Sequence, residues 1–167
     1  FTTTPRQLAS AIATLANQGQ RMQPHLLYAT QGAGSETPQL QPYHPLNQLP
    51  ILEQKNWDKV HDSMRRVVHS KRGTAKRIGR KSKYTIAGKT GTAQVYTVKQ
   101  DEEYNEDEIP EHLRDHALFV AFAPLEDPEI AIAVIVENGG HGGSVAAPIA
   151  KKIMDRYLLE SHTGTNG

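Results

Sequence analysis

The sequence contains no cysteine. It also lacks any apolar run of about 18 residues, the length that a membrane-spanning helix needs. The first absence excludes disulfide bonds and thiolate metal sites, and it fits an oxidising or a reducing compartment equally well. Residues 1–5 lack an initiating methionine and the basic-then-apolar pattern of a signal peptide. We therefore expect the natural beginning of the protein to lie upstream of Phe1.

An excess of charge of one sign is lacking as well, because 19 basic residues offset 18 acidic ones and leave a formal net charge of +1. Residues 65–83 nevertheless hold nine lysines or arginines and no acid, whereas residues 101–111 form an acidic stretch. Such a basic stretch could bind phosphates, but it lacks aromatic side chains for base stacking. We interpret it as a solvated helix end and loop that the acidic stretch neutralises or that attracts acidic peptides. We expect no nucleic-acid partner.

Two helices are predicted in the first half of the chain, which at 167 residues has the size of one domain. Thr4 is a suitable N-cap, Pro5 fits the first helical position and Gln7 completes a capping box. Apolar residues at three- and four-residue steps predict a second helix over roughly residues 53–69. The prolines between the two helices allow only short extended pieces, such as one over residues 25–30.

Strand-like segments dominate the second half of the chain. Residues 84–98 favour one strand, and two apolar runs over residues 117–123 and 130–136 favour two antiparallel strands joined by a short turn. Ser144 is a suitable N-cap for a last helix. The apolar face predicted for that helix consists of Ala146, Ile149, Ile153 and Tyr157. Because strands and helices do not alternate, we predict an α+β fold in which helices cover an antiparallel sheet.

One strand-like segment, Ile-Ala-Gly-Lys-Thr-Gly-Thr-Ala-Gln-Val over residues 86–95, carries a lysine and two hydroxyl groups that a core strand does not need. In a strand Thr90 and Thr92 point to the same face, and Gly91 between them leaves room for another extended backbone. Lys89 adds a cation beside the two hydroxyl groups, a combination suited to a carboxylate. The pattern predicts a site for an anionic peptide end. The simpler alternative is a solvated strand face.

Three other segments suggest binding sites, and each has a simpler structural interpretation. The segment Gly88-Lys89-Thr90 resembles the end of a phosphate-binding loop, but Lys83 stands where that motif needs a glycine. His112 and His116 have a spacing that zinc ligands can have, but the glutamate of H-E-x-x-H is missing. The glycines of residues 139–143 could bind an anion, and we favour a sharp strand-to-helix turn instead. We expect neither a metal nor a cofactor.

The longer segment Gly88-Lys89-Thr90-Gly91-Thr92-Ala93-Gln94 resembles the K-T-G signature of the penicillin-binding proteins and serine β-lactamases. Further segments that resemble this family, in the same order, are Thr4-Pro5-Arg6-Gln7-Leu8-Ala9, Pro24-His25-Leu26, Gly73-Thr74-Ala75, residues 115–124 and Glu137-Asn138-Gly139-Gly140. The polar insertion after the K-T-G strand resembles the elongation-type class B enzymes of Gram-negative rods. The resemblance implies the C-terminal portion of a transpeptidase domain over residues 1–160. We expect residues 161–167 to fray, as the ends of chains commonly do.

The same resemblance implies an enzyme that crosslinks peptidoglycan stem peptides by D,D-transpeptidation and is inhibited by β-lactams. Lys89 would then anchor the substrate carboxylate and support a proton network, and Thr90 and Thr92 would bind the same carboxylate on either side of Gly91. The N–H of Thr92 would be one of two oxyanion-hole donors. The family also implies a periplasmic domain with an inner-membrane anchor outside this chain, working with a glycan polymerase and other proteins of the elongation machinery.

The acylating serine of the family is missing from these residues. None of the seven serines is followed by lysine at the third position, and none starts an S-x-N triad. Ser63-Met64-Arg65-Arg66 comes nearest, but arginine cannot act as the general base. Both motifs precede K-T-G in this family, so we expect them upstream of Phe1 and expect these residues alone not to acylate. The alternative is a non-catalytic module that binds peptides and never had a nucleophile.

Overall fold

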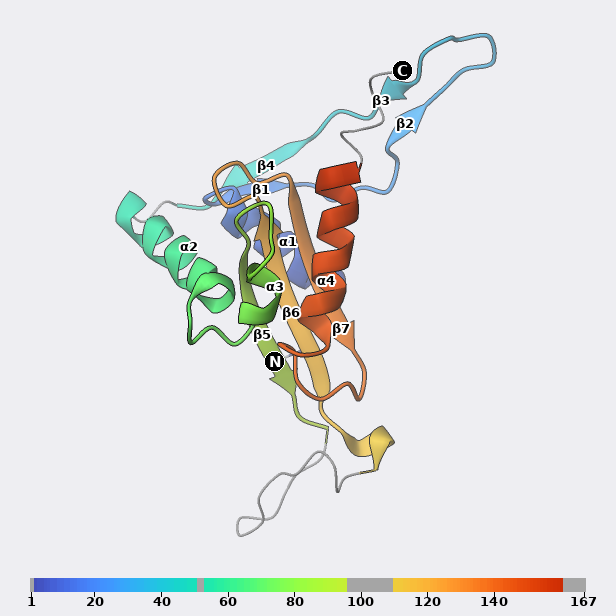
Figure 1. Ribbon diagram of the computed structural model, residues 1–167. Helices are drawn as coiled ribbons and strands as arrows, with labels where there is room; N and C mark the ends of the chain where they lie inside the picture. Colours follow the sequence, from blue (N-terminus) through green and yellow to red (C-terminus); the bar gives the residue numbers. More distant parts are fainter. Residues whose placement is uncertain (1, 51–52, 96–109, 161–167) are drawn as a thin grey trace.

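The computed structural model describes residues 2–50, 53–95 and 110–160 (Figure 1). In chain order its elements are α1 (Pro5–Ala16), β1 (Gln20–Met22), β2 (Ala29–Thr30), β3 (Gln39–Leu40), β4 (Pro45–Gln48), α2 (Gln54–His69), α3 (Lys76–Gly79), β5 (Ala87–Ala93), the 3-10 turn Glu111–Leu113, β6 (His116–Ala123), β7 (Ile130–Val136), α4 (Ala146–Asp155) and the π-helical turn Arg156–Glu160. No helix within these ranges is long and apolar enough to cross a membrane. The predicted tail, residues 161–167, and most of the acidic stretch lie outside the described residues.

Helix α1 begins as the sequence predicts. The Thr4 hydroxyl accepts the N–H of Gln7 at 3.3 Å, and Oε1 of Gln7 accepts the N–H of Thr4 at 2.8 Å. These two bonds satisfy N–H groups that have no acceptor within the helix. The chain turns out of the helix at Gly19, whose φ of +94° suits glycine.

Strands β5, β6 and β7 form one antiparallel sheet in that order, which confirms the predicted α+β fold. Strand β6 pairs with both neighbours and is the central strand, whereas β5 and β7 lie at the edges. Strand β5 is shorter than the predicted strand over residues 84–98, of which residues 96–98 are not described. The K-T-G segment therefore lies on an edge strand of this sheet.

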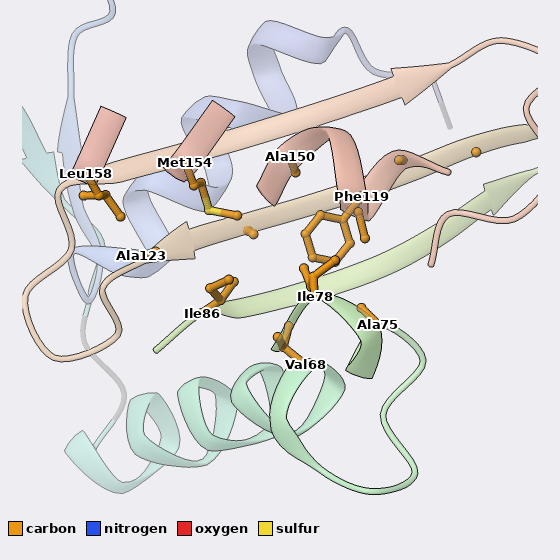
Figure 2. Packing of buried hydrophobic residues seen from close by; sticks show 13 residues of the cluster. Val68, Ala75, Ile78, Ile86, Phe119, Ala123, Ala150, Met154 and Leu158 are labelled. Carbon is orange, nitrogen blue, oxygen red and sulfur yellow. The ribbon is translucent and has the colours of Figure 1, made fainter. Parts of the chain in front are cut away.

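Helices cover both faces of the three-stranded sheet. Helix α4 packs on one face, α1 packs on the other, and α2 lies along β5 (Figure 1). Figure 2 shows the larger core cluster, in which the fully buried ring of Phe119 on β6 lies between α4 and Ile78 of α3. A smaller cluster on the α1 face joins Ala16, Ala87 and Phe122. Burying an aromatic ring such as Phe119 is among the larger contributions to the stability of a core.

Helix α4 presents a different face to the sheet from the one that the sequence analysis predicts. The buried residues of α4 and the turn after it are Ala146, Ala147, Ala150, Met154 and Leu158. Of the predicted face only Ala146 is buried, while Ile149, Ile153 and Tyr157 stay 40–47% exposed. The helix has two apolar stripes, and the alanine stripe lets its backbone approach the bulky Phe119 more closely than isoleucines would.

The predicted cap of α4 is also wrong. The helix begins at Ala146, with Val145 in the N-cap position and no side-chain cap. The Ser144 hydroxyl donates instead to the carbonyl oxygen of His141 at 3.2 Å. Its hydrogen bond therefore closes the turn before the helix.

The connector between α1 and α2 forms short strands of two to four residues, as the prolines predict, and of the expected piece over residues 25–30 only Ala29–Thr30 is a strand. Strand β1 pairs with β4, and β2 pairs with β3, so the connector folds back on itself in two antiparallel ladders. In Figure 1 the β2–β3 end of this arm extends away from the sheet. Leu26 and Tyr28 on the arm are exposed.

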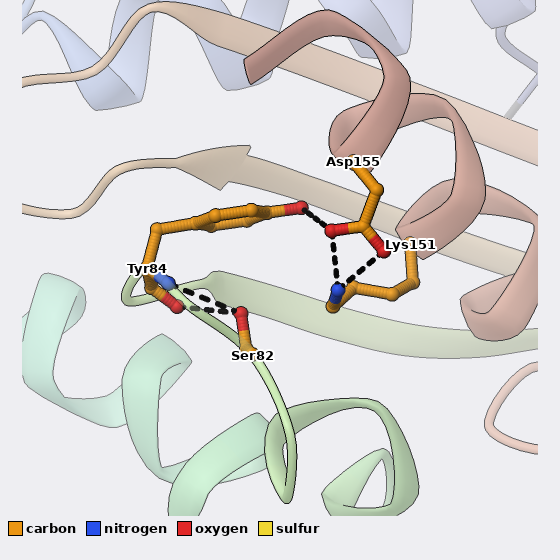
Figure 3. Close-up of polar contacts among 4 residues, drawn as sticks. All are labelled: Ser82, Tyr84, Lys151 and Asp155. Carbon is orange, nitrogen blue, oxygen red and sulfur yellow. Dashed lines mark hydrogen bonds and ion pairs between the residues drawn. The ribbon is translucent and has the colours of Figure 1, made fainter. Parts of the chain in front are cut away.

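A polar cluster joins the C-terminal helix to the chain just before β5 (Figure 3). The Tyr84 hydroxyl donates to Asp155 at 2.9 Å, and Nζ of Lys151 contacts both oxygens of the same carboxylate at 2.5 and 2.6 Å. Burial, followed by the neighbouring Asp155 carboxylate, raises the pKa of Tyr84 well above its usual range. The phenol therefore stays protonated at neutral pH and acts as a donor.

Candidate functional site

The K-T-G segment occupies β5, and the strand register assigns its side chains to faces. Thr90 lies opposite Phe119, and Thr92 lies opposite Ala117, both of which belong to the core cluster on the α4 face. Because directly paired residues share a face, the two threonine side chains project toward the α4 face. The predicted common face of the two hydroxyl groups is confirmed. Thr92 is exposed and Thr90 is half-buried.

Lys89 starts from the opposite face of the strand, because it alternates with both threonines. Its Nζ nevertheless donates to the carbonyl oxygen of Thr90 at 2.6 Å. The ammonium group therefore stays at the backbone of the motif, with the side chain exposed. An exposed cation at the backbone of the motif can attract a carboxylate.

A second threonine, Thr74, lies beside the K-T-G strand. Thr74 is on the turn between α2 and α3, and its Oγ1 lies 2.9 Å from Oγ1 of Thr90. The sequence alone gives Thr74 no role, although Gly73-Thr74-Ala75 is among the segments that resemble the family. A single sequence could not reveal the contact, because 16 residues separate the two hydroxyl groups.

The glycine-rich turn before α4 packs directly on this strand. A Cβ atom at Gly142 would overlap the backbone oxygens of Gly91 and Leu118, and one at Gly143 would overlap the carbonyl oxygen of Thr74. Gly140 has a φ of +72°. These contacts support the interpretation of the glycines as a tight turn. Among the described residues, a Cβ atom at Gly91 would meet only Cβ of Leu118, at 3.2 Å, so Gly142 does not fill the place of the missing side chain.

The segment with two histidines is held by backbone contacts. His116 Nδ1 accepts the N–H of Asn138 at 2.9 Å, and the Asn138 amide donates to the carbonyl oxygens of His112 and Arg114 at 3.0 and 2.9 Å. The part of the chain that the structure describes contains no group of three metal-ligating side chains. These bonds support the interpretation of both histidines as loop and strand-edge residues.

A buried carboxylate that the sequence analysis did not single out links the K-T-G strand to the glycine turn. Asp115 is 5% exposed, and its carboxylate accepts the N–H of Val95 at 3.1 Å. Its carbonyl oxygen accepts the N–H of Gly140 at 2.8 Å. Asp115 therefore positions both the end of the K-T-G segment and the turn that packs on it.

His69 makes the start of β5 sensitive to pH. Its Nε2 accepts the N–H of Ile86 at 3.0 Å, which requires a neutral imidazole. Burial, and then the charge of Arg65, lower the pKa of His69 below its usual 6.5, while Glu126 opposes them. Because the folded state has the lower pKa, the stability from neutral His69 is fully present above pH 6.5 and is lost as the pH falls through the folded-state pKa.

Replacing His69 by glutamine, which cannot take up a proton in this range, is expected to weaken the loss of stability between pH 7.5 and 5. The difference between the unaltered protein and the variant in the loss of unfolding free energy should be on the order of 1 kcal/mol, the net contribution of one hydrogen bond. Urea unfolding at the two pH values measures it, with replacement of the exposed His44 by glutamine as the control. An unchanged pH dependence in the His69→Gln variant would contradict this role.

The family model for the penicillin binding protein transpeptidase domain matches residues 1–155 of the chain. The chain belongs to this family. A curated relative, the peptidoglycan D,D-transpeptidase MrdA of Acinetobacter baumannii, is 49% identical over 159 residues, which are 95% of this chain and 23% of that protein. The chain thus spans about a quarter of the length of the curated relatives that it matches.

Solved structures of the family have the same fold. Penicillin-binding protein 2 of Pseudomonas aeruginosa, in complex with WCK 5153, is 44% identical with a TM-score of 0.71, and the match covers 94% of this chain and 31% of that one. Penicillin-binding protein 2 of Helicobacter pylori, in complex with MreC, is 30% identical with a TM-score of 0.68 and covers 94% and 25% of the two chains. The expected resemblance to the elongation-type penicillin-binding protein 2 is confirmed.

Proposed function

We propose that the full-length protein is a serine-type D,D-transpeptidase that crosslinks peptidoglycan stem peptides and binds penicillin. The observation that carries this proposal is the K-T-G strand of a chain belonging to the transpeptidase family, with Thr90 and Thr92 on one face and the Lys89 ammonium held at the motif backbone. The name of the A. baumannii relative, a D,D-transpeptidase, supports the same reaction.

In this proposal residues of β5 hold the substrate and stabilise charge. The hydroxyl groups of Thr90 and Thr92 donate to the terminal carboxylate of the donor peptide, and Lys89 neutralises its charge. The N–H of Thr92 is one of two donors to the oxyanion that forms when the serine attacks the scissile carbonyl, an interaction of about 3 kcal/mol in the transition state. Lys89 also supports the proton network around the serine.

The nucleophile in this proposal lies outside residues 1–167, because no serine here has a lysine at the third position. The serine oxygen forms an ester with the donor peptide as the terminal amino acid leaves with a proton. The amine of a second stem peptide then attacks the ester and releases the serine. Penicillin forms the same kind of ester, but its leaving group stays attached within the opened ring.

The proposed location and partners of the full-length protein are based on its relatives. We place the full-length protein at the periplasmic face of the inner membrane, anchored outside these residues. There it works with a glycan polymerase and other elongation proteins, and the H. pylori complex with MreC supports such partners. The basic residues 65–83 run from the end of α2, which packs along β5, through α3 to the chain before β5, where we propose that they attract acidic stem peptides.

A labelling experiment separates an enzyme from a binding module. The full-length protein should form a stable adduct with fluorescent penicillin that survives denaturing electrophoresis, and residues 1–167 alone should not. A module without a nucleophile, the competing function that the missing serine motif favours, would bind penicillin reversibly and show no labelled band in either case. Sequencing upstream of Phe1 tests the same point, since an S-x-x-K motif is required there.

A further inference from the structure

The contact between Thr74 and Thr90 brings a hydroxyl group from outside the K-T-G signature to its central threonine. The two Oγ1 atoms lie 2.9 Å apart, a normal distance for a hydrogen bond between hydroxyl groups. Either oxygen can be the donor in the free protein. The contact joins the turn after α2 to β5 across 16 residues of sequence.

The turn that carries Thr74 is closely packed on both sides of the residue. Ala75 is 1% exposed, and its N–H donates to the carbonyl oxygen of Val67 at 3.0 Å. A Cβ atom at Gly73 would overlap the carbonyl oxygens at the end of α2, so the turn lies directly against that helix. Gly143 of the turn before α4 packs on the carbonyl oxygen of Thr74 from the other side. The backbone of Thr74 is therefore held by both neighbouring turns, and its hydroxyl reaches Thr90 from there.

The number of hydrogens fixes the direction of the bond once a ligand arrives. A threonine hydroxyl has one hydrogen to donate and two lone pairs that accept, and a carboxylate only accepts. If Thr90 donates its single hydrogen to the carboxylate of a peptide or a β-lactam, Thr90 cannot also donate to Thr74. The hydrogen between the two threonines must then come from Thr74.

We propose that Thr74 is a positioning residue for carboxylate recognition, which donates to Thr90 and so aims the Thr90 hydrogen at the ligand carboxylate. This inference rests on the proposed function, because it assumes that Thr90 binds a carboxylate. Chains of hydrogen bonds polarise one another, so the Thr74 donor also strengthens the bond from Thr90 to the charged ligand. Thr74 need not touch the ligand to have this effect.

The test measures acylation of the full-length protein and its variants by a fluorescent penicillin and by the matched compound whose carboxylate is esterified. Thr74→Val keeps the shape but removes the donor, and it should slow acylation by the free acid about tenfold, which is the effect of about 1.4 kcal/mol. Acylation by the ester should slow much less. Thr74→Ser should restore the rate, and Thr30→Val, at an exposed position on β2, should leave it unchanged.

A double-mutant cycle keeps the inference falsifiable even if valine perturbs the turn. In a Thr90→Val background, the further change Thr74→Val should have no additional effect on acylation by the free acid. If Thr74→Val slows acylation by the acid and by the ester equally, or if its effect adds fully to that of Thr90→Val, the role of Thr74 is overturned. Neither outcome would contradict the proposed enzymatic activity. Failure of the unaltered full-length protein to form any adduct would instead overturn the proposed function itself.

Discussion

Replacement of Lys89 by alanine in the full-length protein is expected to slow acylation by penicillin by at least about a hundredfold. Lys89 is exposed and its ammonium lies at the backbone of the motif, 2.6 Å from the Thr90 carbonyl oxygen. Its removal leaves the substrate carboxylate without its cation and the proton network around the serine without its lysine, and a loss of about 3 kcal/mol corresponds to a factor of about 100 to 200. Stopped-flow measurement of adduct formation against penicillin concentration gives the rate.

The matched control for Lys89 is Lys152, an exposed lysine of α4, whose replacement by alanine should leave the rate unchanged. Because Lys89 packs in neither core cluster, the alanine variant should unfold at the same urea concentration as the unaltered protein. Undiminished labelling of the Lys89→Ala variant would remove this lysine from the proposed site.

Replacement of Gly142 by alanine is expected to disturb both stability and acylation. The added methyl group would overlap the backbone oxygens of Leu118 and Gly91, and neither can move without shifting its strand. Overpacking against fixed atoms costs about 1–3 kcal/mol, and here we expect the upper end because backbone is displaced. Since Gly91 belongs to the K-T-G motif, the same shift should slow acylation about tenfold or more.

Gly32→Ala is a matched control for this variant. A Cβ atom at Gly32, on the connector arm, would have no atom within 4 Å, so the same chemical change should be nearly neutral there. Gly142→Ala should therefore unfold at a lower urea concentration than Gly32→Ala, and it should be labelled by penicillin more slowly. Wild-type stability together with a wild-type labelling rate in Gly142→Ala would contradict the close packing of the turn on β5.

Much of the fold could be predicted from local sequence signals. The capping box at Thr4 and Gln7 needs only neighbouring residues, and the apolar runs of β6 and β7 identify buried strands by themselves. The face of α4 could not be predicted this way, because the helix carries two apolar stripes. The shape of the sheet beneath, with Phe119 projecting from it, selects the alanine stripe.

In the candidate site, too, some features could be predicted from the sequence and others depend on tertiary contacts. The common face of Thr90 and Thr92 follows from strand periodicity alone. The contacts of Thr74 and Asp115 with the K-T-G segment depend on tertiary structure, because 16 and 20 residues separate the partners. The sequence does hold one sign of the role of Asp115, which is an acidic residue close to an apolar run. A carboxylate that such a strand carries into the core needs hydrogen-bond partners, so contacts of Asp115 could have been predicted.

Peptide mapping of the penicillin adduct tests most directly whether β5 is one wall of an acylating site. The full-length protein is treated with penicillin and digested, and mass spectrometry locates the added mass. We predict that the adduct is on a serine that is followed by lysine at the third position and lies outside residues 1–167. An adduct on any of the seven serines within these residues, or no adduct at all, would contradict the proposed site.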